Sequence, residues 1–374
     1  MNVPKLRFKE FNDEWCYQSL SKYVNRITTK NKNNESDLVL TISAQYGLVD
    51  QTFFFNRSVS SSNLTGYYLL NNGDFAYNKS YSNGYPWGAI KRLNKYNQGV
   101  VSSLYICFKT NNLIDSNFLE QYFETNKWYQ QISEVSVEGA RNHGLLNIAV
   151  NDFFNTKHYI PSIKEQEKIS KFLSLLDKKI ELQTKKIEDL KLFKKGLSNN
   201  IFNNLKNFEE YKLGDLCNIT TGKLDANAMV ENGKYRFYTC AKEYSFIDEY
   251  SFDTEALLIS GNGAYVGYIH YYNGKFNAYQ RTYILHNFKY NVQYIKCYLD
   301  EYLSEKINLE KKDGNTPYIV LSTLSDMIIK IPSSFEQLKI SKIINICNCK
   351  LEIEKNKLIK LKELKKGLMQ NMFV

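Results

Sequence analysis

The sequence predicts an α+β fold organised as a tandem repeat, with two mixed α/β domains separated by two long helices that form an antiparallel coiled coil. The first observation is that residues 160–202 align without a gap with residues 331–373. The second is that a stretch of alternating β-branched and aromatic runs, typical of strands, precedes each of these segments. The predicted parts are a first domain at 1–159, a first helix at 160–203, a second domain at 204–330 and a second helix at 331–374.

The two repeated segments begin and end alike. Each opens with Ile-Pro-Ser, continues with Glu-Gln and closes with Lys-Lys-Gly-Leu. The serine and the glutamate three residues later have the spacing of a capping box, so a helix should begin at each site. Because the apolar pattern continues past Gly196 and Gly367, we expect helical glycines at a close approach rather than C-caps. The capping pairs are Ser162 with Glu165 and Ser333 with Glu336.

Apolar residues recur at spacings of three and four along both segments, as a coiled-coil seam requires. At a rise of 1.5 Å per residue, each helix would be roughly 60 Å long. Two such helices in one chain most simply pair antiparallel, although each could instead pack on its own domain. Both seams are interrupted at equivalent positions, Gln183 with Lys194 and Glu354 with Lys365, which favours pairing. The seam residues are Ile169, Leu173, Leu176, Ile180, Ile187, Leu190, Leu197 and Ile201, and Ile340, Ile344, Cys347, Leu351, Leu358, Leu361, Leu368 and Met372.

The two domains are also related to each other, more weakly. Both open with an aromatic residue five positions before a leucine, Trp15 to Leu20 and Tyr211 to Leu216. Both then reach an Ile-Thr-Thr triplet and alternate strand patterns with Gly/Asn-rich turns. Short helices are expected near 116–130 and 292–308.

The net charge of +10 permits a polyanionic partner, but its distribution is uneven. It divides into +3 for residues 1–161, +4 for 162–203, −2 for 204–332 and +5 for 333–374. An AT-rich genome would also account for the abundant Lys, Asn and Tyr. No apolar run is long enough to span a bilayer, and no secretory signal is visible at the start. Seven scattered cysteines fit a reducing compartment, so we expect a cytoplasmic location.

Several enzyme classes lack their sequence signatures. There is no Walker loop, no Asn-Pro-Pro or Asp-Pro-Pro core of an amino-methyltransferase, and no metal spacing among the four histidines. Those histidines are expected to be loop or packing residues. The glycine-rich run 261–267 follows a strand pattern and precedes another, which predicts a tight turn rather than a dinucleotide loop. We therefore expect no metal site and no catalytic residue in this chain.

The doubled helix starts, the Lys-Lys-Gly-Leu ends and the domain before each helix resemble the specificity (S) subunits of type I restriction-modification systems, over essentially the whole chain. The resemblance implies two target recognition domains, each reading one half of a split asymmetric DNA target, with the coiled coil setting the spacer. It further implies a non-catalytic subunit that docks two modification subunits, which bind S-adenosylmethionine and methylate adenine. Two restriction subunits would add ATP- and magnesium-dependent translocation and cleavage.

Candidate DNA contacts lie in the turns of both domains. Arg and Lys side chains hydrogen-bond guanine, Asn and Gln pair with adenine, and Lys also binds phosphates. The alternative for each residue is a solvated loop position. The candidates are Lys79, Tyr81, Asn83, Tyr85, Lys91, Arg92 and Arg141 in the first domain, and Asn262, Tyr265, Lys275, Asn277, Tyr279, Gln280, Arg281, Lys311 and Lys312 in the second.

Two other functions fit the same sequence. One is a fused methyltransferase or nuclease whose active site has no recognised motif. Methyl transfer by the purified chain alone would reveal it. The other is a coiled-coil interaction protein with no DNA role, which a footprint on a bipartite DNA target would exclude.

Overall fold

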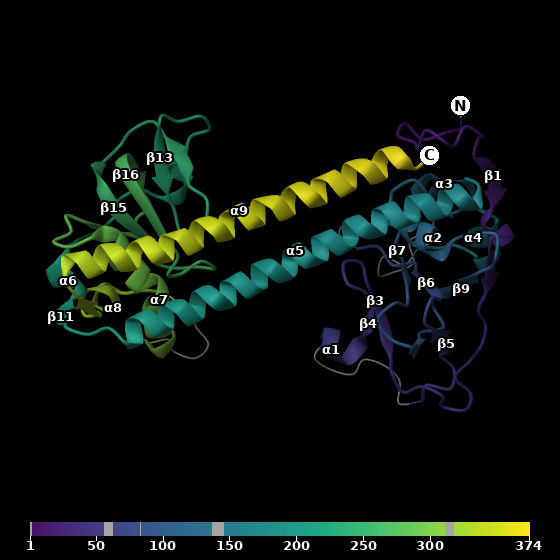
Figure 1. Cartoon of the computed structure of the whole chain (residues 1–374), viewed down its shortest axis with the longest axis horizontal. Coiled ribbons are helices and arrows are strands. Elements are labelled where there is room, and N and C mark those ends of the chain that lie inside the picture. Colours follow the sequence, from purple (N-terminus) through teal and green to yellow (C-terminus); the bar gives the residue numbers. More distant parts are fainter. Residues whose placement is uncertain (1, 56–62, 83, 137–145, 311–317) are drawn as a thin grey trace. The chain divides into compact units, whose positions relative to one another are not determined.

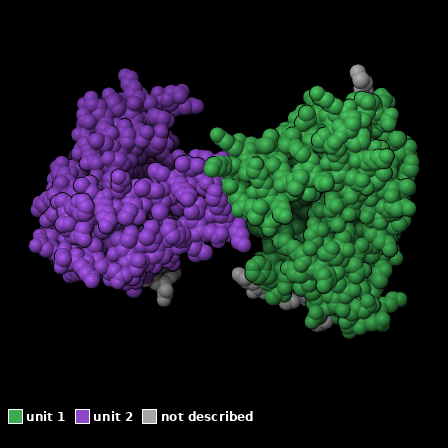
Figure 2. Space-filling view, in the orientation of Figure 1, with its two compact units in different colours: residues 1–184, 357–374 green, residues 185–356 purple. Residues whose placement is uncertain are grey.

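The computed structural model describes residues 2–55, 63–82, 84–136, 146–310 and 318–374. These residues divide into two compact units, coloured separately in Figure 2. Unit 1 consists of residues 1–184 with 357–374, and unit 2 consists of residues 185–356. Each unit therefore contains one globular domain and part of each long helix. Of the predicted residues, Asn83, Arg141, Lys311 and Lys312 lie outside the described part of the chain.

The globular part of unit 1 is built on a four-stranded antiparallel sheet in the order β2-β9-β6-β7, of which Figure 1 labels β6, β7 and β9. Two further strand pairs, β3 with β4 and β5 with β8, accompany this sheet. The strands are β2 (Val24–Arg26), β3 (Leu40–Ser43), β4 (Gly47–Asp50), β5 (Tyr68–Asn71), β6 (Phe75–Asn78), β7 (Ala89–Arg92), β8 (Gln98–Val101) and β9 (Ile106–Thr110). The short helices are η1 (Leu20–Lys22), α1 (Gln51–Phe55), α2 (Ser116–Phe123), α3 (Tyr129–Val135) and α4 (Val150–Asn155).

Unit 2 repeats this strand order and extends it. Its six-stranded sheet runs β12-β17-β15-β16-β13-β14, so the first four strands correspond to β2-β9-β6-β7. Only the β13–β16 pairing within this sheet is parallel. The strands are β12 (Asn218–Thr221), β13 (Tyr235–Tyr238), β14 (Ser245–Ile247), β15 (Phe252–Ser260), β16 (Ile269–Ala278) and β17 (Thr282–His286). The helices are α6 (Leu213–Leu216), η2 (Ala226–Ala228), α7 (Val292–Glu310) and α8 (Leu321–Ser325).

Each domain is closed by an antiparallel strand pair that joins its first strand to the strand before its long helix. In unit 1, β1 (Cys16–Ser19) pairs with β10 (Lys157–Ile160). In unit 2, β11 (Glu209–Lys212) pairs with β18 (Ile328–Ile331). The repeated aromatic-to-leucine spacing brings Leu20 and Leu216 to equivalent places just after these first strands, where both are buried. The weaker relationship between the two domains in sequence is thus present in their topology.

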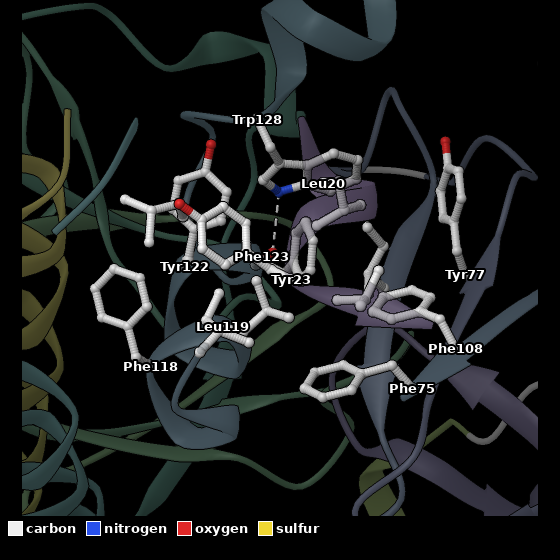
Figure 3. Close-up of a cluster of buried hydrophobic side chains, with 14 of the residues drawn as sticks. Leu20, Tyr23, Phe75, Tyr77, Phe108, Phe118, Leu119, Tyr122, Phe123 and Trp128 are labelled. Carbon is white, nitrogen blue, oxygen red and sulfur yellow. Dashed lines mark hydrogen bonds between the residues drawn. The ribbon is translucent and has the colours of Figure 1, made fainter. Parts of the chain in front are cut away.

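The main core of unit 1 is aromatic, as Figure 3 shows. Phe75 and Phe108 stack with ring centroids 5.2 Å apart, and Trp128 donates its indole N–H to the Phe123 carbonyl at 3.1 Å. The same core includes Ile169 and Leu173 of the first long helix, Met369 and Met372 of the second, and Phe373, which directly follows the second. The helices are therefore part of the domain core and not an appendage to it.

The long helices are α5 (Ile163–Asn203) and α9 (Ser334–Met372). In unit 1, Lys365 of α9 pairs with Asp177 of α5 at 2.5 Å. In unit 2, Lys186 of α5 pairs with Glu354 of α9 at 2.9 Å. A later residue of α5 thus meets an earlier residue of α9, which is antiparallel pairing. Every predicted seam residue is buried or half-buried, and two of the four predicted polar interruptions supply these ion pairs. The predicted fold class is confirmed.

Both helix starts use their glutamine in the same way. Gln166 donates to the Pro161 carbonyl at 2.9 Å and accepts the backbone N–H of Asp115 at 2.8 Å. Gln337 donates to the Pro332 carbonyl at 2.8 Å and accepts the backbone N–H of Asn291 at 3.1 Å. Asp115 and Asn291 in turn accept a backbone N–H in the first turn of α2 and of α7. We call these two arrangements the glutamine bridges.

Two details of the predicted helices were wrong. At the second start, the Ser333 hydroxyl accepts the Glu336 backbone N–H as in a capping box, and it donates to the Glu336 carboxylate. At the first start, the Glu165 carboxylate instead binds Arg7 at 2.7 and 2.8 Å. Glu165 is buried, so the nearby guanidinium is a stronger partner than an exposed backbone N–H. Gly196 and Gly367 are helical, but no described atom lies within 4 Å of a Cβ built on either, so neither marks a close approach.

The glycine-rich run 261–267 is a turn, as predicted. It joins β15 to β16, which are antiparallel neighbours. Gly263 and Gly267 have φ of +81° and +80°, a conformation that favours glycine. The run precedes a strand, so it has no helix N-terminus to bind a phosphate.

The first prediction concerns the helix seam. Leu173→Ala removes a fully buried side chain from the unit 1 core and should cost about 2–5 kcal/mol of stability, because it leaves a cavity. Leu175→Ala, on the same helix, truncates an exposed leucine and is the matched control. We expect a clear fall in the urea midpoint, followed by circular dichroism, for the first variant only. Equal midpoints would contradict the assignment of Leu173 to the seam.

A second prediction concerns His158, which is buried in unit 1. The Thr156 hydroxyl donates its proton to the Phe153 carbonyl, so Thr156 can only accept from His158, whose Nε2 lies 2.8 Å away. The other ring nitrogen, Nδ1, then accepts from the Tyr122 hydroxyl at 2.8 Å. Burial lowers the pKa of His158 from 6.5 to about 3, since this pocket accommodates only the neutral ring. Between those pH values the unfolded chain binds the extra proton, so stability should fall as the pH drops.

The expected loss between pH 7 and pH 5 is about 2 kcal/mol from this one group. It would be measured as the difference in melting temperature between the two pH values. His158→Gln should show a smaller acid-induced drop than the unaltered protein. His286→Gln, in unit 2, is the control and should retain the full drop. An identical drop in all three proteins would be inconsistent with a neutral buried His158.

Candidate nucleic-acid interface

One arginine of unit 2 is held between two aromatic rings at the surface of the six-stranded sheet. The Arg236 guanidinium, on β13, lies 4.3 Å from the ring centre of Tyr244 and 4.4 Å from that of Tyr272. Tyr272 is on β16, the strand beside β13, and Tyr244 precedes β14. Contacts of this kind attract a cation to the ring faces and restrict its orientation. We call Arg236, Tyr244 and Tyr272 the arginine sandwich.

A third tyrosine, Tyr238, hydrogen-bonds to the arginine of the arginine sandwich. Tyr238, two residues along the same strand, is buried, and its hydroxyl lies 3.4 Å from Nη1 of Arg236. Its ring packs against Phe276 and His270, at 5.9 and 5.1 Å between centroids. The hydrogen bond with Tyr238 raises the pKa of Arg236 above its ordinary value, so the guanidinium stays cationic. The sandwich is thus a fixed positive group on a rigid strand.

Other cationic and aromatic groups are exposed in unit 2. Lys242 lies over the ring of Tyr265 at 5.1 Å, and Lys275 lies over that of Tyr250 at 4.7 Å. Arg281 is exposed just before β17. Positive charges beside aromatic faces suit a nucleic-acid ligand, which offers phosphates and base rings.

The structure divides the predicted contacts of unit 2 by accessibility. Tyr265, Lys275, Gln280 and Arg281 are exposed, although Gln280 donates to Asp225 at 2.8 Å. Asn262 and Tyr279 are half-buried. Asn277 is buried and bonds to backbone groups, donating to the Glu249 carbonyl at 3.2 Å and accepting from Ala278 at 2.9 Å. Its side chain therefore serves the domain in this structure.

The predicted contacts of unit 1 are mostly engaged within the domain. Tyr81 is exposed. Lys79 donates to the Ile148 carbonyl at 3.0 Å, and the Tyr85 hydroxyl donates to the Ala44 carbonyl at 3.2 Å. Lys91 is buried against Glu124 at 2.5 Å, and Arg92 pairs with Glu120 at 3.3 Å. The last two cations are already neutralised, so Tyr81 is the most accessible of the described candidates in this unit.

Sequence reasoning missed the arginine sandwich. Its local signal was the run Tyr235 to Tyr238, in which a single arginine stands among three aromatic residues on a strand. A period of two places Arg236 and Tyr238 on one face. Tyr272 is 36 residues away from Arg236 in the sequence, and the parallel pairing of β13 with β16 brings the two residues close. No pattern in the sequence predicted that pairing.

No group of three or more His, Cys, Asp or Glu side chains in the described ranges could hold a metal ion. None of the helices that the structure describes combines the length and apolarity needed to span a lipid bilayer.

Comparisons with known proteins agree on one family. Residues 205–363 match the family described as the type I restriction modification DNA specificity domain. The specificity subunit of the type I restriction enzyme EcoDI of Escherichia coli is 35% identical over 159 residues, covering 42% of this chain and 35% of that subunit. A type I specificity subunit of Mycoplasma genitalium is 24% identical over 246 residues, covering 61% of this chain and 64% of its own length. The matches thus span about a third of the first relative and just under two thirds of the second.

The fold extends the likeness to the whole chain. The crystal structure of the type I restriction-modification S subunit from M. genitalium has a TM-score of 0.65 at 19% identity, covering 100% of this chain and 99% of that one. A chain solved in work on complex assembly and conformational transition of a type I system has a TM-score of 0.59 at 14% identity, covering 98% and 99%.

The tandem domains and paired helices therefore define a protein with the S-subunit fold. Residues 205–363 are similar to the type I restriction modification DNA specificity domain. The chain is similar to type I specificity subunits, as its two helix motifs predicted.

Proposed function

We propose that this chain is the sequence-specific DNA-binding subunit of a type I restriction-modification complex. Each globular domain reads one half of a split, asymmetric target, the paired helices set the spacer, and the modification subunits dock on the chain. The observation that carries the proposal is the specificity-domain match of residues 205–363. The amino-terminal domain and helix, which precede this segment, repeat the same pattern.

The differences between the two domains support two unlike half-sites. They share the core strand order, but only the second adds β13 and β14, and with them the arginine sandwich. The first domain presents Tyr81 and neutralises two of its predicted cations. Because base readout depends on the side chains and loops at the DNA edge, domains that differ there should select different bases.

The helix pairs support a spacer of constant register. Lys365–Asp177 and Lys186–Glu354 each put one charged seam residue in contact with the opposite helix. Sliding one helix along the other would separate Glu354, which is buried, from Lys186. The polar seam positions thus favour one alignment over its neighbours.

Apolar residues outside the seam support docking of two identical partners. Leu175, Leu182 and Phe193 of α5 are each more than half exposed, and so are Ile346, Ile353 and Leu364, which stand at the equivalent positions of α9. A two-helix coiled coil buries only its seam, so exposed residues of this kind suit a partner helix. Their duplication offers the same surface twice.

The chemistry of such a complex belongs to the partners in this proposal. S-adenosylmethionine would bind the modification subunits, and ATP and magnesium would act on two restriction subunits. The chain itself would carry out no bond-making step, and its place would be the cytoplasm.

The third prediction is the form of the DNA target. Co-expression with its modification subunits, followed by genome methylation profiling, should reveal methylated adenines in a motif of two unlike halves and a gap of several bases. Deleting this chain should abolish that motif. A single continuous palindrome would contradict the split readout. Methyl transfer by the purified chain alone, with S-adenosylmethionine and unmethylated DNA, would instead identify an enzyme.

The fourth prediction tests docking. The double variant Leu175→Asp with Ile346→Asp places charges on the proposed partner surface and should prevent co-purification with the modification subunit. Both residues are exposed, so the melting temperature should change little. Leu104→Asp, at an exposed leucine between β8 and β9, is the matched control and should leave the complex intact. Retention of the partner by the double variant would rule out this surface.

A further inference from the structure

We propose that Arg236 reads a guanine in the half-site bound by the second domain, with Tyr244 and Tyr272 as positioning residues. This inference rests on the proposed function, since it names one base-reading group within the second domain. Its argument comes from the geometry and charge of the arginine sandwich.

The arginine sandwich leaves one part of the guanidinium available. The ring centres of Tyr244 and Tyr272 lie 4.3 and 4.4 Å from Cζ of the guanidinium, and aromatic rings of this kind leave the N–H groups free to hydrogen-bond. Nη1 has Tyr238 as its partner at 3.4 Å. Nε and Nη2 have no hydrogen-bond partner among the described residues, and neither is a buried unsatisfied atom. The open edge therefore suits an acceptor from outside the protein.

The charge of Arg236 is not neutralised within the domain. Arg7 and Arg92 are bound by Glu165 and Glu120, respectively. Arg236 has no ion pair among the described residues, and the groups that act on its charge are all tyrosines. A cation fixed by aromatic rings in this way keeps its attraction for an electron-rich ligand.

Guanine suits this group better than a phosphate does. Guanine presents O6 and N7 side by side in the major groove, and the planar fork of arginine contacts both at once. Phosphates are less demanding in orientation, and exposed lysines near the sandwich, Lys234 and Lys242, are available for them. The chain has only seven arginines among its 49 basic residues, so a stacked arginine here marks a place where planar geometry matters.

Preorganisation strengthens the same assignment. Arg236 lies on a strand in the interior of a sheet, and its rotamer is fixed by two rings and a hydrogen bond. A side chain that is already ordered loses less freedom on binding, so more of its hydrogen-bond energy contributes to discrimination.

The test uses the full complex of this chain with its modification subunits. Methylation rates are measured on duplexes carrying the motif and on a set with each base pair of both halves replaced in turn. Arg236→Lys keeps the charge but removes the planar fork. We expect it to reduce discrimination at one G·C position of one half by about tenfold or more, with the other positions unchanged. The melting temperature of the chain should stay the same.

Positioning variants and a control sharpen the result. Tyr244→Leu and Tyr272→Leu keep Arg236 but remove its stacking, and should weaken discrimination at the same base pair only. Arg26→Lys makes the identical exchange at an exposed arginine of the first domain, and should leave that base pair unaffected.

Two outcomes of Arg236→Lys would overturn the inference. One is a uniform change at all positions, which would indicate a backbone contact. The other is unchanged discrimination throughout. A complex of the unaltered chain that shows no sequence preference in either half would count against the proposed function instead.

Discussion

The structure depends on one repeated contact, the glutamine bridge at the start of each long helix. Gln166 and Gln337 are both buried, and each amide joins a proline carbonyl before the long helix to the backbone N–H that opens a domain helix. A buried amide without partners would be costly, whereas one that is bonded at both ends stabilises a single geometry. Each long helix therefore leaves its domain in a defined direction.

The same use of polar groups recurs along the chain. Glu165 beside Arg7, His158 between two hydroxyls and Glu354 beside Lys186 are all buried groups with bonded partners. Such groups add little net stability compared with apolar packing, but they penalise every alternative arrangement. The arginine sandwich follows a different rule, since its polar edge is left open toward solvent. That difference between satisfied and available polar groups separates the framework of this protein from its candidate DNA surface.

The sequence predicted the framework well because the framework is periodic. A helical seam, a proline break and a repeated motif are local patterns, and the positions of α5, α9 and the turn at 261–267 followed from them. The domain relationship was visible only through a few residues, but the shared strand order bears it out. The glutamines of the repeated motif stood out in sequence, although their partners, at Asp115 and Asn291, did not.

The candidate surface was much harder to predict. Whether a loop lysine faces solvent depends on which carboxylate the fold brings to it, and Lys91 meets Glu124 from 33 residues away. The Asn277 side-chain amide similarly donates to the Glu249 carbonyl, 28 residues away in the sequence. Tyr272 reaches Arg236 only through a parallel strand pairing, which no local pattern specifies. The candidate contacts on the described surface, Tyr81, Lys275 and Arg281 among them, stay predictions.

The first domain also has an unusual dependence on the order of synthesis. Met369, Met372 and Phe373 belong to its core, where Phe373 packs edge-on against Trp15 at 6.5 Å. While the ribosome makes the roughly 190 residues after the first half of α5, at 5–20 residues per second, that core lacks its final side chains for about 10–40 s. A nascent chain would lack the Phe373 ring that contacts Trp15, Phe118 and Tyr122 throughout this interval. Chaperone capture should therefore peak on the amino-terminal domain and end when the last turn of α9 emerges.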